Sequence, residues 1–100
     1  MQMLATQPKF PLGQLMMSRG VADLVASNAA FAKFCIDSLY RHASGDWGDL
    51  CPEDKKENKL ALKQGSLRIF SAYENKCLPK IWIITEADRS ATTTLFPDEY

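Results

Sequence analysis

The last third of the chain alternates short β-rich runs with short turns, and this pattern limits the fold more than any other feature. Residues 80–85, Lys-Ile-Trp-Ile-Ile-Thr, are β-branched and aromatic, which is typical of a strand. Two further β-rich runs, at residues 67–73 and 91–96, flank it. Connections this short make neighbouring strands antiparallel. We therefore predict an antiparallel meander from about residue 67 to residue 96, with the middle run at its centre.

Helical patterns occupy the chain before the meander. The clearest covers residues 29–43, where apolar side chains recur at helical spacing, namely Phe31, Phe34, Cys35 and Leu39. A shorter helix is expected after Ser18, which suits an N-cap, and another from Pro52 to about Gly65. Residues 10–17 contain a proline and fit a short edge strand or an extended segment. The fold class is therefore α+β: an N-terminal short strand and two to three helices packed on a C-terminal three- to four-stranded antiparallel meander.

The overall composition indicates one globular domain. The chain has 100 residues, which we divide into a tail at 1–9 and a single α+β domain at 10–100. Lys plus Arg equals Asp plus Glu at 12 each, so net charge favours neither a nucleic acid nor an anionic membrane as the main partner. We expect no membrane span and no signal peptide.

The cysteines and the histidine do not indicate a metal site. Three cysteines without a CxxC motif, together with one histidine, argue against bound zinc. A reducing cytoplasm is the expected setting, and no cofactor is predicted. We expect His42 to cap a helix or to be partly buried.

Two polar segments, a loop near residues 45–50 and a turn near residues 86–90, hold the candidate binding residues. These residues are Asp46, Trp47, Asp49, Glu86, Asp88, Arg89 and Ser90. If the segments meet, four carboxylates could bind a divalent cation or serve acid–base chemistry. Otherwise the acids cap their own turns and Arg89 pairs with a nearby acid, since Asp and Gly favour loops for conformational reasons. Trp47 is either a lid folded over the core or an exposed contact for a partner.

The strands offer one further candidate surface. Trp82 lies among isoleucines in the middle run and is expected in the core. Thr92 and Thr94 share one side of their strand, and we expect that side to face solvent beside basic residues, namely Arg68, Lys80 and Arg89. Such a face could touch a phosphate backbone. No P-loop, GxGxxG, GxSxG or RNP-like motif is present, so catalysis and nucleic-acid binding have no motif support.

Four stretches carry a family resemblance, at residues 10–14, 45–49, 81–93 and 95–100. Together they resemble small proteins carried on plasmids, integrative elements and phage-like islands, which are often labelled plasmid-related protein or type I restriction endonuclease subunit M. The most specific part is Trp-Ile-Ile-Thr-Glu-Ala-Asp-Arg-Ser at 82–90. The resemblance implies a mobile-element accessory protein without an established activity. The methyltransferase label carries no weight, because the chain is too short for a Rossmann domain and lacks its glycine fingerprint.

Three functional hypotheses follow, in order of preference. The first is a non-enzymatic mobile-element accessory protein that binds a host or element-encoded protein and modulates a defence system such as restriction or CRISPR. The second is a nucleic-acid-binding accessory factor that uses the sheet or the lysine-bearing third helix. The third is a metal-dependent enzyme built on the loop carboxylates. A homodimer is also an expected state, because a sheet of few strands leaves edges that invite pairing.

Overall fold

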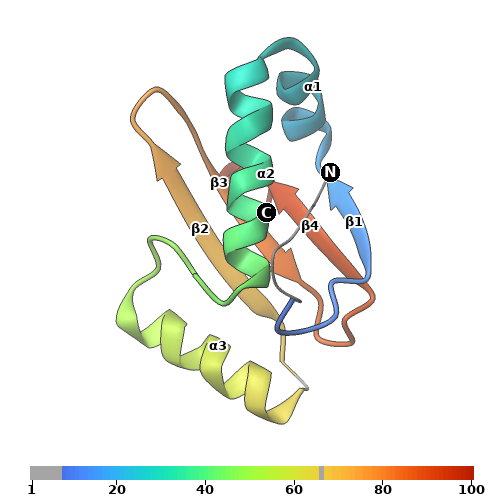
Figure 1. Ribbon diagram of the computed structural model, residues 1–100, viewed down its shortest axis with the longest axis vertical. Helices are drawn as coiled ribbons and strands as arrows, with labels where there is room; N and C mark the ends of the chain where they lie inside the picture. The colour runs from blue at the N-terminus through green and yellow to red at the C-terminus, as the bar shows by residue number, and fades with distance from the viewer. Residues whose placement is uncertain (1–7, 66) are drawn as a thin grey trace.

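The computed structural model describes residues 8–65 and 67–100 (Figure 1). Over these residues the chain forms four strands, three α-helices and one short 3-10 helix. In chain order they are β1 (Gln14–Met17), α1 (Arg19–Ser27), α2 (Ala29–Ala43), α3 (Pro52–Gln64), β2 (Ile69–Asn75), β3 (Leu78–Thr85), β4 (Ala91–Leu95) and η1 (Pro97–Glu99). The predicted α+β class and the predicted order of helices and strands are confirmed.

The strands form one mixed sheet in the order β1-β4-β3-β2. The antiparallel meander β2-β3-β4 is as predicted, and β3 lies between its two neighbours. The short strand β1 lies at an edge, as Pro11 in the segment before it indicated, but it pairs with β4 in parallel. Along the sequence, all three α-helices come between β1 and the meander. This long connection allows β1 and β4 to run in the same direction and to form a parallel pair.

Local signals set the helix ends where the sequence predicted them. The Ser18 hydroxyl accepts a hydrogen bond from a backbone N–H in the first turn of α1, and Asn28 does the same for α2. Pro52 occupies the first turn of α3. Gly65 ends α3 in the left-handed region, with φ of 72°.

The sheet has two unlike faces. Strand alternation places Tyr73, Ile81 and Ile83 on the face that α1 and α2 cover, and these three side chains are fully buried. We call this the helix face. The opposite face carries the alternate residues of each strand, and we call it the open face. Figure 1 shows α1 and α2 on one side of the sheet and α3 beside the start of β2.

The buried line along α2 differs from the predicted stripe. It passes through Phe31, Cys35, Ser38 and His42, so two polar side chains face the sheet. Of the predicted stripe, Phe34 and Leu39 are only partly buried, at its margins. The prediction missed His42 because the two hydroxyl groups that bond its imidazole, those of Ser71 and Thr85, come from distant strands of the sheet.

The beginning of the described chain is already part of the fold. The Lys9 N–H donates a hydrogen bond of 2.9 Å to the Ala43 carbonyl at the end of α2. The predicted tail at 1–9 stays a prediction, because residues 1–7 lie outside the described residues.

The outer edge of β2 is covered by other parts of the chain. The Asn58 amide, which is only 2% exposed, accepts from the Phe70 N–H at 3.0 Å and donates to the Phe70 carbonyl. Two residues further along, the Ala72 N–H donates to the Trp47 carbonyl, and the Ala72 carbonyl accepts from the Asp49 N–H. These contacts take up the outward backbone groups that an edge strand otherwise exposes. We call this the closed edge.

Candidate functional site

Trp47 folds over the core as a lid. Its side chain is 6% exposed and packs near the rings of Phe10 and His42, with centroid distances of 6.2 Å and 5.9 Å. The first of the two predicted roles is thereby confirmed. A side chain this buried offers no contact to a partner, so Trp47 leaves the list of binding candidates.

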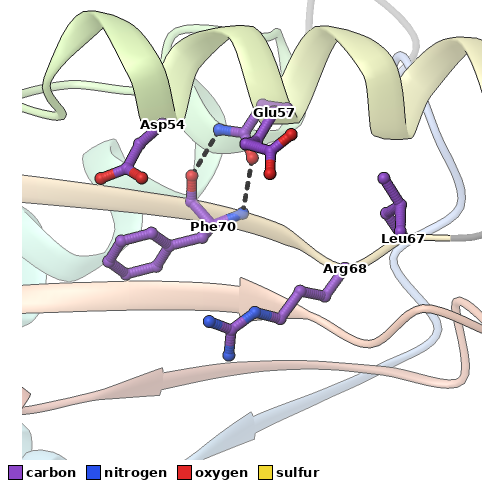
Figure 2. A pocket seen from close by; sticks show the side chains of 6 residues that line it. Asp54, Glu57, Leu67, Arg68 and Phe70 are labelled. Carbon is purple, nitrogen blue, oxygen red and sulfur yellow. Dashed lines mark hydrogen bonds between the residues drawn. The ribbon is translucent and has the colours of Figure 1, made fainter.

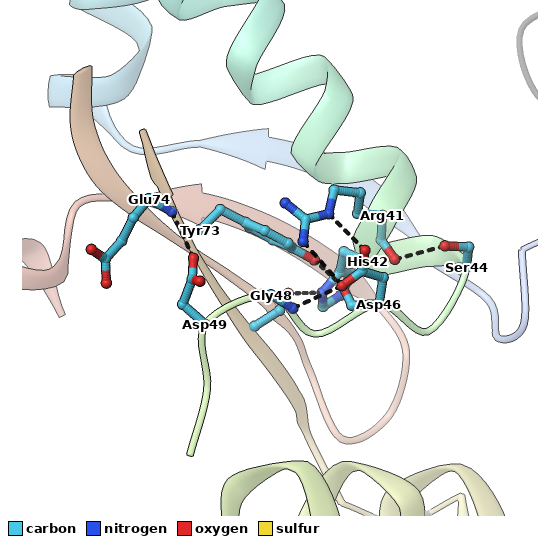
Figure 3. A network of polar contacts seen from close by, with 9 residues as sticks. Arg41, His42, Ser44, Asp46, Gly48, Asp49, Tyr73 and Glu74 are labelled. Atoms are coloured by element: carbon cyan, nitrogen blue, oxygen red, sulfur yellow. Dashed lines mark hydrogen bonds and ion pairs between the residues drawn. The ribbon is translucent and has the colours of Figure 1, made fainter. Parts of the chain in front are cut away.

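Asp46 holds its own loop in place. Its carboxylate accepts hydrogen bonds from Arg41 Nε at 2.7 Å and from the Gly48 N–H at 3.1 Å (Figure 3). The hydrogen bond from Arg41 is the main cause that lowers the pKa of Asp46 below its usual value. The Asp46 carbonyl accepts from the Tyr73 hydroxyl at 2.6 Å. These contacts are turn-capping, which is the structural role that the sequence left open.

Asp49 belongs to the closed edge. Its carboxylate accepts a hydrogen bond of 3.0 Å from the Glu74 N–H at the end of β2 (Figure 3). The close approach of loop and strand depends on Gly48, which has φ of 72° and lies so near the Ala72 carbonyl that a Cβ would overlap it. Asp46, Trp47 and Asp49 therefore dock the loop on the protein itself.

The turn between β3 and β4 is packed in the same way. Asp88 accepts a hydrogen bond of 3.0 Å from the Ser90 N–H, and its bonding to Ser90 is the main cause that lowers the pKa of Asp88. The Glu86 N–H donates to the Ala91 carbonyl at 3.0 Å. Gly13, with φ of 64°, lies directly against the backbone of Ser90. Of the predicted candidates here, Glu86, Asp88 and Ser90 shape the turn.

Arg89 has a different role from the one predicted. It adopts φ of 61°, the left-handed region that side chains rarely occupy. Its guanidinium donates to four carbonyls, namely those of Ala61, Leu67, Glu86 and Ala87. The expected pairing with an acid is wrong, because none of its hydrogen-bond acceptors in the described residues is a carboxylate. Arg89 ties the turn to the end of α3 and to the chain leading into β2.

The two polar segments do not form one site. The loop at residues 45–50 bonds to the middle and end of β2, whereas the turn at residues 86–90 bonds to α3 and to the start of β1. Within residues 8–65 and 67–100, no group of three or more His, Cys, Asp or Glu side chains could hold a metal ion. The four-carboxylate cation site therefore has no geometric basis in the described chain.

The threonines expected on a solvated face are buried. Thr92 is 1% and Thr94 6% exposed, and both lie on the helix face. The expectation failed because β4 carries hydroxyl groups inward, where they meet other polar groups. Thr92 donates to the Leu12 carbonyl at 2.7 Å and bonds Thr85 at 2.7 Å.

A buried imidazole organises these polar groups. His42 is fully buried; its Nε2 lies 2.9 Å from the Thr85 hydroxyl, and its Nδ1 bonds Ser71. The Thr92 hydroxyl donates its proton to the Leu12 carbonyl. The Thr85 hydroxyl must therefore donate to Thr92 and accept from Nε2–H of His42. Nδ1 is then the acceptor for Ser71. Burial lowers the pKa of His42 to about 3, so the ring is neutral.

The open face carries a row of aromatic side chains that sequence reasoning did not identify as a site. Phe70 and Trp82 meet edge to face at a centroid distance of 4.9 Å, and Trp82 meets Tyr100 at 5.7 Å. The Arg68 guanidinium lies 5.2 Å from the Tyr100 ring centroid. Phe70 and Trp82 are half-buried, and Tyr100 is 67% exposed. We call these four residues the aromatic face; the expectation that Trp82 is core was wrong.

The chain fixes Tyr100 in this position through its C-terminal turn. Glu99 accepts hydrogen bonds from the Ser18 hydroxyl, the Gly20 N–H and the Phe96 N–H. The bond from Ser18 is the main cause that lowers the pKa of Glu99. The last turn is therefore anchored at the start of α1, and the following residue reaches the open face.

A hollow of about 260 Å³ adjoins the aromatic face at the start of β2. Its lining residues are Asp54, Glu57, Asn58, Leu67, Arg68 and Phe70 (Figure 2). Asp54 and Glu57 project from α3 on one side, and Leu67 and Phe70 form the apolar part. Asn58 is already bonded to the strand, so the two carboxylates and Arg68 are the charged groups that could meet a ligand here.

The signal for the aromatic face was present but ambiguous. Along β3, Lys80, Trp82 and Ile84 alternate with Ile81 and Ile83, so both faces of the strand contain apolar residues. Such a pattern identifies a central strand without showing which side the helices cover.

No protein-family model matches the chain, and neither does any curated protein or solved structure. In the part of the chain that the structure describes, no helix is both long and apolar enough to cross a bilayer.

Proposed function

We propose that this chain is a non-enzymatic accessory protein that binds another protein through its aromatic face. The observation that carries the proposal is the row formed by Phe70, Trp82 and Tyr100 on the side of the sheet opposite α1 and α2. Trp, Tyr and Arg are the residues most enriched where binding energy concentrates in protein interfaces. Here all three types, with Arg68, lie within one patch.

The hollow beside the patch defines the chemistry of the partner. Asp54 and Glu57 offer two carboxylates next to the ring of Phe70. A lysine or arginine could lay its aliphatic stem on that ring and bring its charge to the carboxylates. The partner surface should therefore present an apolar side chain for the row and a basic side chain for the hollow.

A non-enzymatic role is supported by the state of the groups that resemble a catalytic pair. His42 and Ser71 are in hydrogen-bond contact, but both are fully buried. A substrate could not reach them without opening the core.

The biological setting rests on the resemblance described above. It suggests an accessory protein of a mobile element, acting in the cytoplasm on a host or element-encoded protein, with a defence system such as restriction or CRISPR as the process modulated. Cys51 and Cys77 are exposed and free, which suits a reducing compartment.

The test is recovery of a stoichiometric partner by the immobilised chain from a host lysate. Tyr100→Ala should reduce recovery about tenfold, because a truncated interface anchor commonly costs more than 1 kcal/mol. Ile36→Ala is the matched control, since Ile36 is 53% exposed on α2, away from the patch. Absence of any stoichiometric partner, or equal losses in both variants, would contradict the proposal.

A second candidate function uses the same surface. Aromatic rows with nearby cations, here Arg68 and Lys80, can stack the bases of single-stranded nucleic acid. Asp54 and Glu57 beside the row, together with the zero net charge, favour the protein partner instead. Fluorescence anisotropy with a labelled oligonucleotide separates the two, because phosphate contacts are strongest at low salt. No binding at low salt eliminates this candidate.

A further inference from the structure

Strand β1 exposes apolar side chains at one margin of the sheet. Leu15, Met16 and Met17 are 56%, 47% and 51% exposed. Alternation directs Met16 to the open face and the other two to the helix face. Three consecutive exposed apolar residues on a strand at the end of a sheet are unusual, because natural edge strands are commonly protected by charges, prolines or bulges.

The backbone of β1 also presents an unused set of hydrogen-bonding groups in the described chain. The N–H groups of Gln14 and Ser18 donate to β4, at 3.0 Å and 2.9 Å. In a parallel ladder, alternate residues point to the same side, so Leu15 and Met17 direct their N–H and C=O groups outward. Within residues 8–65 and 67–100, β4 is the one strand that pairs with β1.

We propose that β1 pairs antiparallel with β1 of a second copy of this chain. The two copies would share one sheet of eight strands, four from each. In the register centred on Met16, each Leu15 faces Met17 of the second copy, and every outward N–H and C=O of these two residues finds a partner. The two Met16 side chains meet on the two-fold axis.

Charge favours a second copy as the occupant of this edge. Strand β1 reads Gln-Leu-Met-Met, so self-pairing brings no like charges together. The whole chain has equal numbers of acidic and basic residues, which removes long-range repulsion between copies. Two-fold self-complementary contacts are also the commonest way in which soluble chains assemble.

The opposite margin of the sheet limits the assembly to two copies. On β2, Asn58 covers Phe70, and the loop containing Asp49 covers Ala72. A sheet with one open edge can pair once and then has closed edges at both ends. The inference does not depend on the partner proposed for the aromatic face.

Disulfide crosslinking tests the register directly. In a Cys51→Ser and Cys77→Ser background, Met16→Cys should give a disulfide-linked dimer under mild oxidation. Opposed residues in a non-hydrogen-bonded pair have Cα atoms about 4.5 Å apart, within disulfide range. Gln14→Cys is the matched control on the same strand and face. Its two copies would lie about 14 Å apart and should not crosslink.

Light scattering with the unmodified full chain tests the state itself. The expected mass is that of a dimer, and Met16→Lys, which would put two ammonium groups on the axis, should weaken association about tenfold or more. A monomer at high concentration overturns the proposal, whether the edge stays free or binds another segment of the same chain. Equal crosslinking of both cysteine variants overturns the register.

Discussion

The two margins of the sheet are treated in opposite ways. On the β2 side, the Asn58 amide and the backbone of residues 47–49 bond the outward groups of the strand. On the β1 side, Leu15 and Met17 turn similar groups outward with more than half of each side chain exposed. This chain can therefore protect an edge strand thoroughly. A role in binding explains the apolar, unprotected edge at β1 better than a lack of protecting residues does.

Three of the seven candidate residues from the sequence belong to the protected side, and the other four belong to the turn between β3 and β4. Asp46 and Asp49 hold the loop that covers β2, and Trp47 seals the core beneath it. These loop residues bond to the protein's own strand and cover its core, and they do not form a ligand site. The residues that can reach a partner lie on the open face and on β1.

The largest expected effect comes from breaking the closed edge at Asn58. Asn58→Asp cannot donate to the Phe70 carbonyl and buries a charge, so the free energy of unfolding should fall by about 3 to 4 kcal/mol. Urea unfolding measures this loss. Asn75→Asp is the control, because exposed Asn75 uses only its carbonyl oxygen, toward the Cys77 N–H, and should change stability by less than about 0.5 kcal/mol. Equal losses would remove the special role of Asn58.

Lowering the pH should reduce the free energy of unfolding, because the buried, neutral His42 bonds Ser71 of β2. The folded pKa is lowered to about 3 from the ordinary value of 6.5, so the unfolded chain takes up the proton first as pH falls. Stability is therefore fully present above the unfolded pKa and declines below it, by about 2 kcal/mol between about pH 7 and pH 5. Unfolding measured across this range checks the loss. An imidazole that titrates near its ordinary pKa in the folded protein, as followed by NMR, would contradict the burial argument.

A smaller effect is expected at the far end of the closed edge. Asp49→Ala removes the acceptor for the Glu74 N–H and should lower the free energy of unfolding by about 1 kcal/mol. Hydrogen exchange at the Glu74 amide should accelerate. Asp49→Asn keeps an acceptor oxygen and should behave nearly as the unmodified chain, so a loss as large as that of the alanine variant would point to charge instead.

The smallest effect is expected at the open edge. Met17→Thr should leave the stability of the dilute protein within about 0.5 kcal/mol, because more than half of the side chain is exposed. At high concentration the unmodified chain should gain stability through association, and the variant should gain less. Thermal unfolding over a concentration series measures both. A large loss in dilute solution would mean that Met17 packs within its own chain.

Local chemistry made the helix ends and the meander predictable. The caps at Ser18 and Gly65 and the first-turn Pro52 act within a few residues, so the sequence alone reveals them. The side of the sheet that the helices cover depends on long-range packing. For that reason Trp82 was expected inside and Thr92 outside, and both expectations failed.

The hydrogen-bonded chain through His42 has a consequence for how this sequence can change. Ser71 donates to the imidazole, the imidazole to Thr85, Thr85 to Thr92, and Thr92 to the Leu12 carbonyl. Every link runs in the same direction, so loss of one member leaves its neighbours buried without a donor or an acceptor. A substitution at one of these four side chains therefore needs a matching change at its neighbours, so we expect Ser71, His42, Thr85 and Thr92 to change together.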